Sequence, residues 1–138
     1  MAKQFTIPSF TLQAMKFGVV GGGATVVHVL AALTYNGLAG VTPLWANFFA
    51  FLTAVIVSYA GNWFWTFNGV SRHFHALPRF ALLALTCFAL NQSIVYGVVE
   101  LLGQPLWLAM VPVVIIIPVL GFWLNKTQVF LPRHSGPQ

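Results

Sequence analysis

Four long apolar stretches, separated by turn residues, dominate the chain. They cover residues 17–38, 44–66, 79–102 and 106–130. At a rise of about 1.5 Å per residue, an α-helix of that length can cross the roughly 30 Å hydrocarbon layer of a bilayer. No formally charged side chain occurs between Lys16 and Arg72. The pattern predicts an all-α integral membrane protein with four transmembrane helices.

The connections between the predicted spans differ in charge. The turns at Gly40–Pro43 and Gly103–Pro105 are short and uncharged, whereas all six Lys and Arg residues lie in the tails, in the middle loop or at the span ends beside it. Basic residues concentrate on the cytoplasmic side of membrane proteins, so we expect both termini in the cytoplasm. The predicted parts are a cytoplasmic tail (1–16), a first hairpin (17–67), a basic cytoplasmic loop (68–78), a second hairpin (79–130) and a cytoplasmic tail (131–138).

The two hairpins are predicted to be copies of each other. When the chain is shifted on itself so that Gly40 falls on Gly103, Asn62 falls on Asn125 without any gap. Each copy contains two spans, so both copies enter the membrane from the same side. The fold class that follows is a pair of parallel-repeat helical hairpins, related by a pseudo-twofold axis along the membrane normal.

Composition narrows the classes of function. The chain is 59% hydrophobic and 5% charged, with a net charge of +5, whereas soluble domains carry roughly 25% charged residues. This excludes a soluble enzyme. The basic residues lie where a membrane protein needs them for orientation, so nucleic acid is not an expected partner. With Glu100 as the single acid and Cys87 as the single cysteine, we expect no catalytic residue, no metal site and no cofactor.

Polar side chains inside membrane spans are costly, so each one is a functional hypothesis. His28 lies near the middle of the first span and aligns with Asn91 in the third span. Such residues either form hydrogen bonds that fix helix packing or contact a substrate or proton, and both interpretations stay open. The intramembrane polar set comprises His28, Asn47, Ser58, Asn91, Gln92, Tyr96 and Glu100.

A second set of candidates lies at the predicted cytoplasmic surface. Cations and amide donors there suit a lipid phosphate, which would accept charge-assisted hydrogen bonds. Membrane topology alone also places cations at this surface, and Trp63 and Trp65 fit an interfacial aromatic belt. The candidate phosphate-binding residues are Lys126, Asn125, Asn62, Arg79, Arg72 and Lys16.

The first span also has a face of small residues. Gly18, Gly21 and Gly22 form it, and Ala81 and Ala84 occupy similar positions in the third span. Small residues let helices approach closely, so we expect a close contact there, either between the repeats or between subunits.

Four short motifs connect the chain to a known family. They are FGVVGGGAT (17–25), PLWAN (43–47), NWFWTF (62–67) and NKTQVF (125–130). With the four spans and the duplicated hairpin, they resemble the GtrA-like family over about residues 15–131. That family is associated with cell-surface polysaccharide synthesis, and flipping of polyprenyl-phosphate-linked sugars is attributed to its founding members. A more distant resemblance links it to the small subunit of dolichol-phosphate-mannose synthase, an accessory partner of a glycosyltransferase.

The resemblance implies a non-enzymatic translocase of an undecaprenyl-phosphate monosaccharide in the bacterial inner membrane. The phosphate would bind at the cytoplasmic cations, and the sugar would pass along the intramembrane polar set. The alternative is an accessory subunit that recruits or stabilises a polyprenyl-phosphate glycosyltransferase without moving lipid. A small drug exporter is disfavoured because the first span has no acid. Four spans enclose little space, so we expect a homo-oligomer or a membrane glycosyltransferase as partner.

Two positions depart from the family pattern. His28 stands where many members carry an acidic residue, and Trp63 stands where a basic residue is common. The second repeat keeps a cation at the matching position, Lys126. We therefore expect the second repeat to dominate contact with the phosphate.

Overall fold

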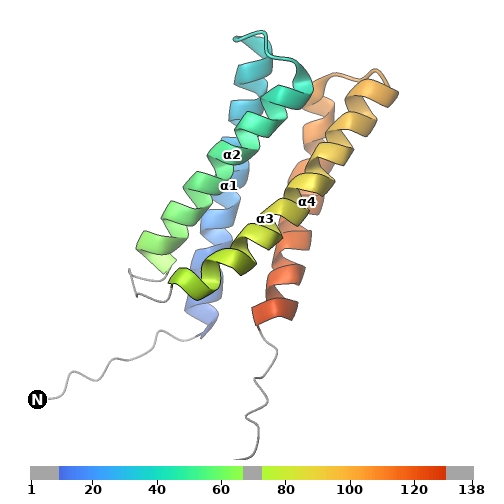
Figure 1. Ribbon diagram of the computed structural model, residues 1–138. Helices are drawn as coiled ribbons and strands as arrows, with labels where there is room; N and C mark the ends of the chain where they lie inside the picture. Colours follow the sequence, from blue (N-terminus) through green and yellow to red (C-terminus); the bar gives the residue numbers. More distant parts are fainter. Residues whose placement is uncertain (1–9, 67–72, 130–138) are drawn as a thin grey trace, which may run out of the picture. The chain divides into compact units, whose positions relative to one another are not determined.

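The computed structural model describes residues 10–66 and 73–129, and the long elements there are all helices (Figure 1). They are α1 (Phe10–Gly37), α2 (Pro43–Gly61), the π-helix η1 (Asn62–Thr66), α3 (His73–Val95), the π-helix η2 (Tyr96–Leu101) and α4 (Leu106–Val129). Three stretches are long and apolar enough to cross a membrane: Met15–Gly37, Pro43–Thr66 and Ala81–Leu101. The fourth helix is apolar over Leu106–Gly121. The chain is an all-helical, four-helix membrane protein, as predicted.

Two helices begin earlier than the predicted spans. The first starts at Phe10 rather than at residue 17, and α3 starts at His73, so residues 73–78 of the predicted loop are helical. Hydropathy locates the part of a helix that fits the bilayer, and a helix can continue beyond that part. Pro78 is the sixth residue of α3, so it removes one N–H that would otherwise donate within the helix. Residues 1–9, 67–72 and 130–138 lie outside the described residues.

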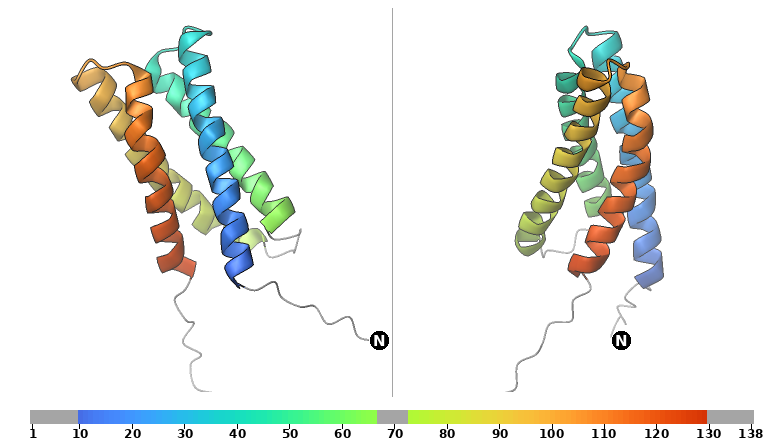
Figure 2. Two further views of the ribbon diagram at one scale, coloured as in Figure 1. Left: turned by 180° about the vertical axis from the view of Figure 1, so that it is seen from behind. Right: turned by 90° about the vertical axis from the view of Figure 1, so that its right-hand side faces the viewer.

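The chain divides into two compact units, one within residues 1–73 and one within 74–138, and each contains one helical hairpin. In the first hairpin α1 runs beside α2 and also contacts η1 (Figure 2). The two helices approach closely at Gly61, where an added Cβ would lie 2.9 Å from Cγ1 of Val20. Ala46 and Ala50 of α2 are completely buried. Small side chains thus allow the first hairpin to close along its length.

The second hairpin is more open. Its helices α3 and α4 meet at their connecting turn and separate toward the opposite end (Figures 1 and 2). The π-helix η2, which adjoins the turn, contacts α4. The two hairpins therefore share a type of connection but differ in how far their helices remain together.

The connecting turns have the same geometry. Gly40 has φ 65° and Gly103 has φ 62°, a left-handed conformation that glycine adopts without the steric cost of a Cβ. Equivalent backbone hydrogen bonds close both turns, from Val41 N to Tyr35 O at 3.0 Å and from Gln104 N to Val98 O at 3.0 Å. The repeat predicted from the sequence therefore extends to the conformation of the backbone.

Burial follows the same repeat. Positions that are equivalent in the two repeats are buried together on α1 and α3, and again on α2 and α4. The pairs are Ala24 and Cys87, His28 and Asn91, Ala32 and Val95, Ala46 and Ala109, Asn47 and Met110, and Ala50 and Val113. The two hairpins thus bury matching faces, although the residue types on those faces differ.

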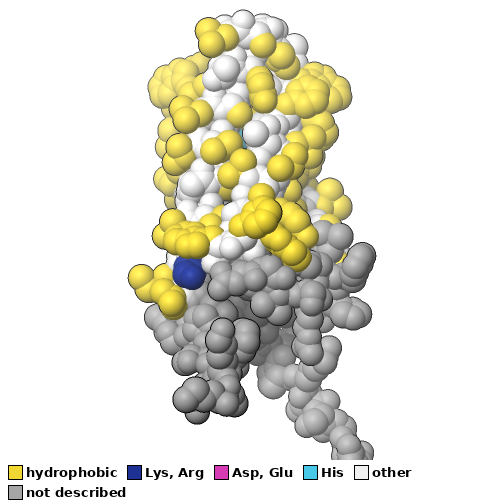
Figure 3. All heavy atoms as spheres, turned by 90° about the vertical axis from the view of Figure 1, so that its left-hand side faces the viewer, with side chains coloured by type: hydrophobic (Ala, Val, Ile, Leu, Met, Phe, Trp, Pro, Cys, Tyr) yellow, Lys and Arg dark blue, Asp and Glu magenta, His cyan; other side chains and the backbone are white. Residues whose placement is uncertain are grey.

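Within the first hairpin, α2 does not pack on the glycine face of α1. A Cβ added at Gly18, Gly21 or Gly22 would have no neighbour within 4 Å. The close approach instead involves Gly61, which the sequence pattern does not single out. Large apolar side chains remain exposed on all four helices, and Figure 3 shows them along the length of one face. Exposure on this scale is expected where lipid rather than water covers the surface.

Candidate functional site

A buried hydrogen bond joins the two helices of the first hairpin. His28 Nε2 on α1 lies 3.0 Å from Asn47 Oδ1 on α2. His28 is 6% exposed and Asn47 is fully buried. Because Oδ1 can only accept, Nε2 carries the hydrogen and donates it. The ring of Phe51, one helical turn beyond Asn47, meets the imidazole edge-on with a centroid distance of 6.1 Å. These contacts fix both the orientation and the tautomer of His28.

The second hairpin has a different pair at the equivalent positions. Asn91 replaces His28 and Met110 replaces Asn47, and both are buried. A thioether sulfur is only a weak acceptor, so the second hairpin lacks the chemistry for the same strong polar bond at this pair of positions. The duplicated backbone therefore carries an asymmetric set of polar groups at matching sequence positions.

The end of α2 holds a second polar cluster. Asn62 Nδ2 donates to Ser58 O at 2.9 Å, and Thr66 Oγ1 donates to Asn62 Oδ1 at 2.9 Å. Asn62 and Thr66 are buried. The helix changes to π geometry from Asn62 to Thr66. Asn62 Nδ2 also lies 3.5 Å from Ser58 Oγ. The amide of Asn62 thus has local partners at both of its polar atoms, which leaves it little capacity for a phosphate.

A cation lies beside this cluster. The Nζ atom of Lys16 is 5.8 Å from the centroid of the Trp65 ring, a cation–π arrangement. Lys16 belongs to α1 and Trp65 to η1, so the contact crosses the first hairpin at the end away from its turn. Sequence analysis proposed both residues for this surface but did not predict their contact. The two residues are far apart in the chain, and no spacing rule connects them.

The remaining candidates differ in their exposure and in whether the structure describes them. Gln92 is half-buried, whereas Tyr96 and Glu100 are exposed. From Tyr96 to Leu101 the helix has π geometry, so Tyr96 and Glu100 lie in a wider turn than the α-helical spacing assumes. Arg72 and the side chains of Arg79, Asn125 and Lys126 lie outside the described part of the chain. Their roles stay predictions.

The family comparison extends over nearly all of this arrangement. A sequence model described as GtrA/DPMS, transmembrane domain, matches residues 16–130. The chain belongs to the GtrA/DPMS transmembrane family. Neither a curated protein nor a solved structure matches it. The matched range covers both hairpins, so both copies of the repeat lie within the family domain.

The described polar groups of this GtrA/DPMS chain are suited to binding. The buried ones are an imidazole, amides and a hydroxyl, which can exchange hydrogen bonds with one another or with a polar ligand. Over residues 10–66 and 73–129, no group of three His, Cys, Asp or Glu side chains is placed to hold a metal ion. The arrangement combines buried hydrogen-bonding groups with a cation at one hairpin end.

Proposed function

We propose that this GtrA/DPMS protein flips a polyprenyl-phosphate-linked monosaccharide across the bacterial inner membrane. The observation that supports the proposal is family membership over both hairpins, in a chain that buries His28, Asn47 and Asn91 within its spans. A sugar loses its water as it crosses the hydrocarbon layer and then needs other hydrogen-bond partners. Buried amides and an imidazole are groups of that kind.

The proposed transport is non-covalent and requires no catalytic residue. The phosphate binds at the cytoplasmic end of the hairpins, where Lys126 and Lys16 supply positive charge. The sugar exchanges hydrogen bonds with the intramembrane polar set, and the isoprenoid chain stays on the lipid-facing surface of the helices. This division places charge at the interface and neutral donors and acceptors at depth, which avoids burial of an unpaired charge.

The direct test is a transport assay in proteoliposomes. Purified protein is reconstituted with a radiolabelled undecaprenyl-phosphate monosaccharide, and the substrate that reaches the outside is scored with a membrane-impermeant reagent. We expect the protein to accelerate exposure, Lys126→Ala to abolish the acceleration and Trp63→Ala to retain it. In complementation of a flipping-deficient strain, we likewise expect Lys126→Ala to fail and Trp63→Ala to succeed. If Trp63→Ala loses transport and Lys126→Ala keeps it, the expected dominance of the second repeat is wrong.

The accessory-subunit function remains the second candidate. The family description joins GtrA with DPMS, and the sequence has a distant resemblance to the small subunit of dolichol-phosphate-mannose synthase. On this interpretation the protein recruits or stabilises a glycosyltransferase through residues 68–78, and substitutions of His28 and Asn91 leave that partner's activity unchanged. Folded protein that binds the lipid but does not accelerate its exposure would favour this second function.

A further inference from the structure

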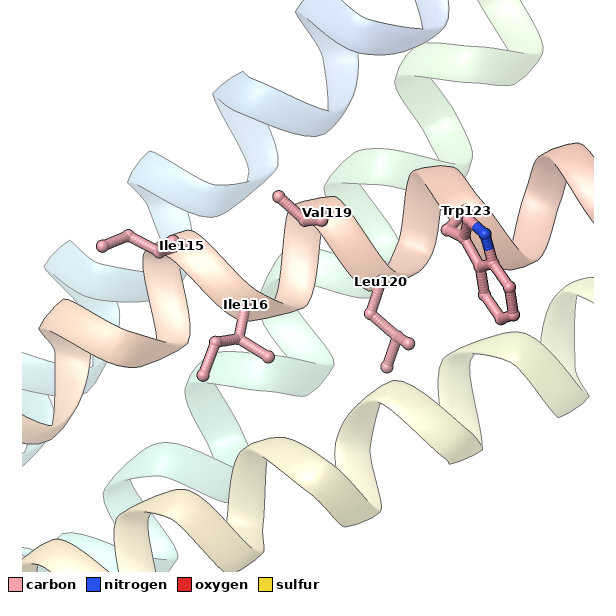
Figure 4. Close-up of a pocket in the computed structure, with 5 residues that line it drawn as sticks. All are labelled: Ile115, Ile116, Val119, Leu120 and Trp123. Carbon is pink, nitrogen blue, oxygen red and sulfur yellow. The ribbon is translucent and has the colours of Figure 1, made fainter.

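The open side of the second hairpin carries an apolar groove. It is a shallow pocket of about 410 Å³ formed by side chains of α4 alone (Figure 4). Its lining residues are Ile115, Ile116, Val119, Leu120 and Trp123. In Figure 4, Leu120 and Trp123 point to the side of α4 on which α3 lies. The groove therefore adjoins the region where the two helices of this hairpin have separated.

The groove leads toward a basic residue. Its lining residues recur at spacings of three and four, which places them on one face of α4. Lys126 follows Trp123 by three residues and Val119 by seven, and α4 continues to Val129. Positions seven residues apart differ by only about 20° around an α-helix. Helical geometry thus places Lys126 on the face of the groove, about one turn beyond its last residue.

The first hairpin lacks the chemistry of this groove. The repeat-equivalent positions of the lining residues lie on α2 and are Leu52, Thr53, Ile56, Val57 and Ala60. A hydroxyl replaces the side chain of Ile116, and a methyl group replaces the indole of Trp123. The basic position is lost as well, because Trp63 stands where the second hairpin has Lys126. The repeat-equivalent face of α2 therefore differs from the groove in two lining side chains and in the basic residue.

We propose that the α4 groove binds the phosphate-proximal isoprenoid units of the polyprenyl carrier while Lys126 binds its phosphate. This inference rests on the proposed function and assigns the carrier lipid to one face of one helix. The occupant follows from the order of the groups, since an apolar chain that ends in an anion matches an apolar groove that ends in a cation. The methyl-branched chain would pack against branched aliphatic side chains and the indole of Trp123.

A binding experiment on the full chain tests this assignment. The protein is placed in phosphatidylcholine nanodiscs, and binding of radiolabelled undecaprenyl phosphate is measured with and without phosphatidic acid as a straight-chain competitor. Val119→Trp fills the groove, and Ile56→Trp is its matched control, because the two positions are repeat equivalents that are 66% and 69% exposed. We expect Val119→Trp to weaken binding about tenfold and Ile56→Trp to change it less than about twofold. Val119→Ala and Ile56→Ala repeat the comparison without added bulk.

Each outcome has a definite meaning. Equal effects of the Val119 and Ile56 variants, or equal competition by phosphatidic acid, would overturn the groove as a carrier site. The same holds if the wild-type protein does not bind undecaprenyl phosphate. If transport persists while the Val119 and Ile56 variants bind the lipid equally, the groove is not the carrier site but the proposed flipping function stands. If binding depends on the groove but the protein does not transport the lipid, the flipping function is wrong and the groove stands as a lipid-binding site.

Discussion

The hydrogen bond between His28 and Asn47 gives the most quantitative prediction. The perturbation is a double-mutant cycle of His28→Leu, Asn47→Leu and the double variant, with the free energy of unfolding measured for each. A cycle isolates the coupling between two side chains, because contacts that only one of them makes cancel. The edge-on contact of His28 with Phe51 cancels in this way, because it involves only His28 of the pair and Asn47→Leu leaves it in place.

The structure sets the expected size of the coupling. The bond is 3.0 Å long and joins two buried side chains on different helices. Interhelical hydrogen bonds in membranes average about 0.6 kcal/mol and reach about 1.7 kcal/mol. Each single substitution also leaves a buried polar atom without this partner, which costs about 1–3 kcal/mol. We therefore expect two destabilising single variants, a double variant less destabilised than their sum, and a coupling of about 0.6 kcal/mol.

The assay is reversible unfolding in mixed detergent micelles, followed by circular dichroism. The matched control is the same cycle at Asn91 and Met110, the equivalent positions of the second hairpin. Its coupling should be smaller than that of the first pair, because a thioether is a weak acceptor. A coupling near zero for His28 and Asn47 would refute the claim that their bond stabilises the hairpin. Unchanged stability with lost transport would assign these side chains to the substrate instead.

Two further predictions concern glycines. Gly61→Ala should destabilise the protein by about 1–3 kcal/mol in the same assay, because its Cβ would lie 2.9 Å from Val20, whereas Gly18→Ala should be nearly neutral because nothing lies within 4 Å. Gly40→Ala and Gly103→Ala should each cost about 1–2 kcal/mol, because both glycines have a left-handed backbone conformation. Clearly unequal costs in the second pair would contradict the structural equivalence of the two turns.

The spans and turns could be predicted from the sequence because their determinants are local. An apolar run long enough to cross the bilayer specifies a helix there. The predicted ends at residues 38 and 102 lie within one residue of the helix ends at Gly37 and Leu101. The repeat also predicted the shared conformation of the two turns, because equal turn length and an equivalent glycine produce the same backbone geometry.

The arrangement of the candidate site could be predicted only in part. The sequence located polar residues at depth, but it did not identify Asn47 as the partner of His28. The sequence also did not predict the change to π geometry from Tyr96 to Leu101. Helical periodicity assumes one helix type throughout, and no residue pattern in this segment indicates the change from α to π geometry. Contacts between helices and departures from α geometry depend on tertiary packing, which a single sequence does not specify.

The cation–π contact changes how the asymmetry of the repeats should be interpreted. In sequence register, the first repeat has lost its cation, since Trp63 stands where the second repeat has Lys126. In the structure, however, Lys16 brings an ammonium group from α1 to the face of Trp65 at the same end of the first hairpin. The loss at one sequence position is therefore accompanied by a charge supplied from the neighbouring helix. A comparison of Lys126→Ala with Trp63→Ala alone could miss a phosphate contact of the first repeat, and adding Lys16→Ala to the series reveals whether that contact exists.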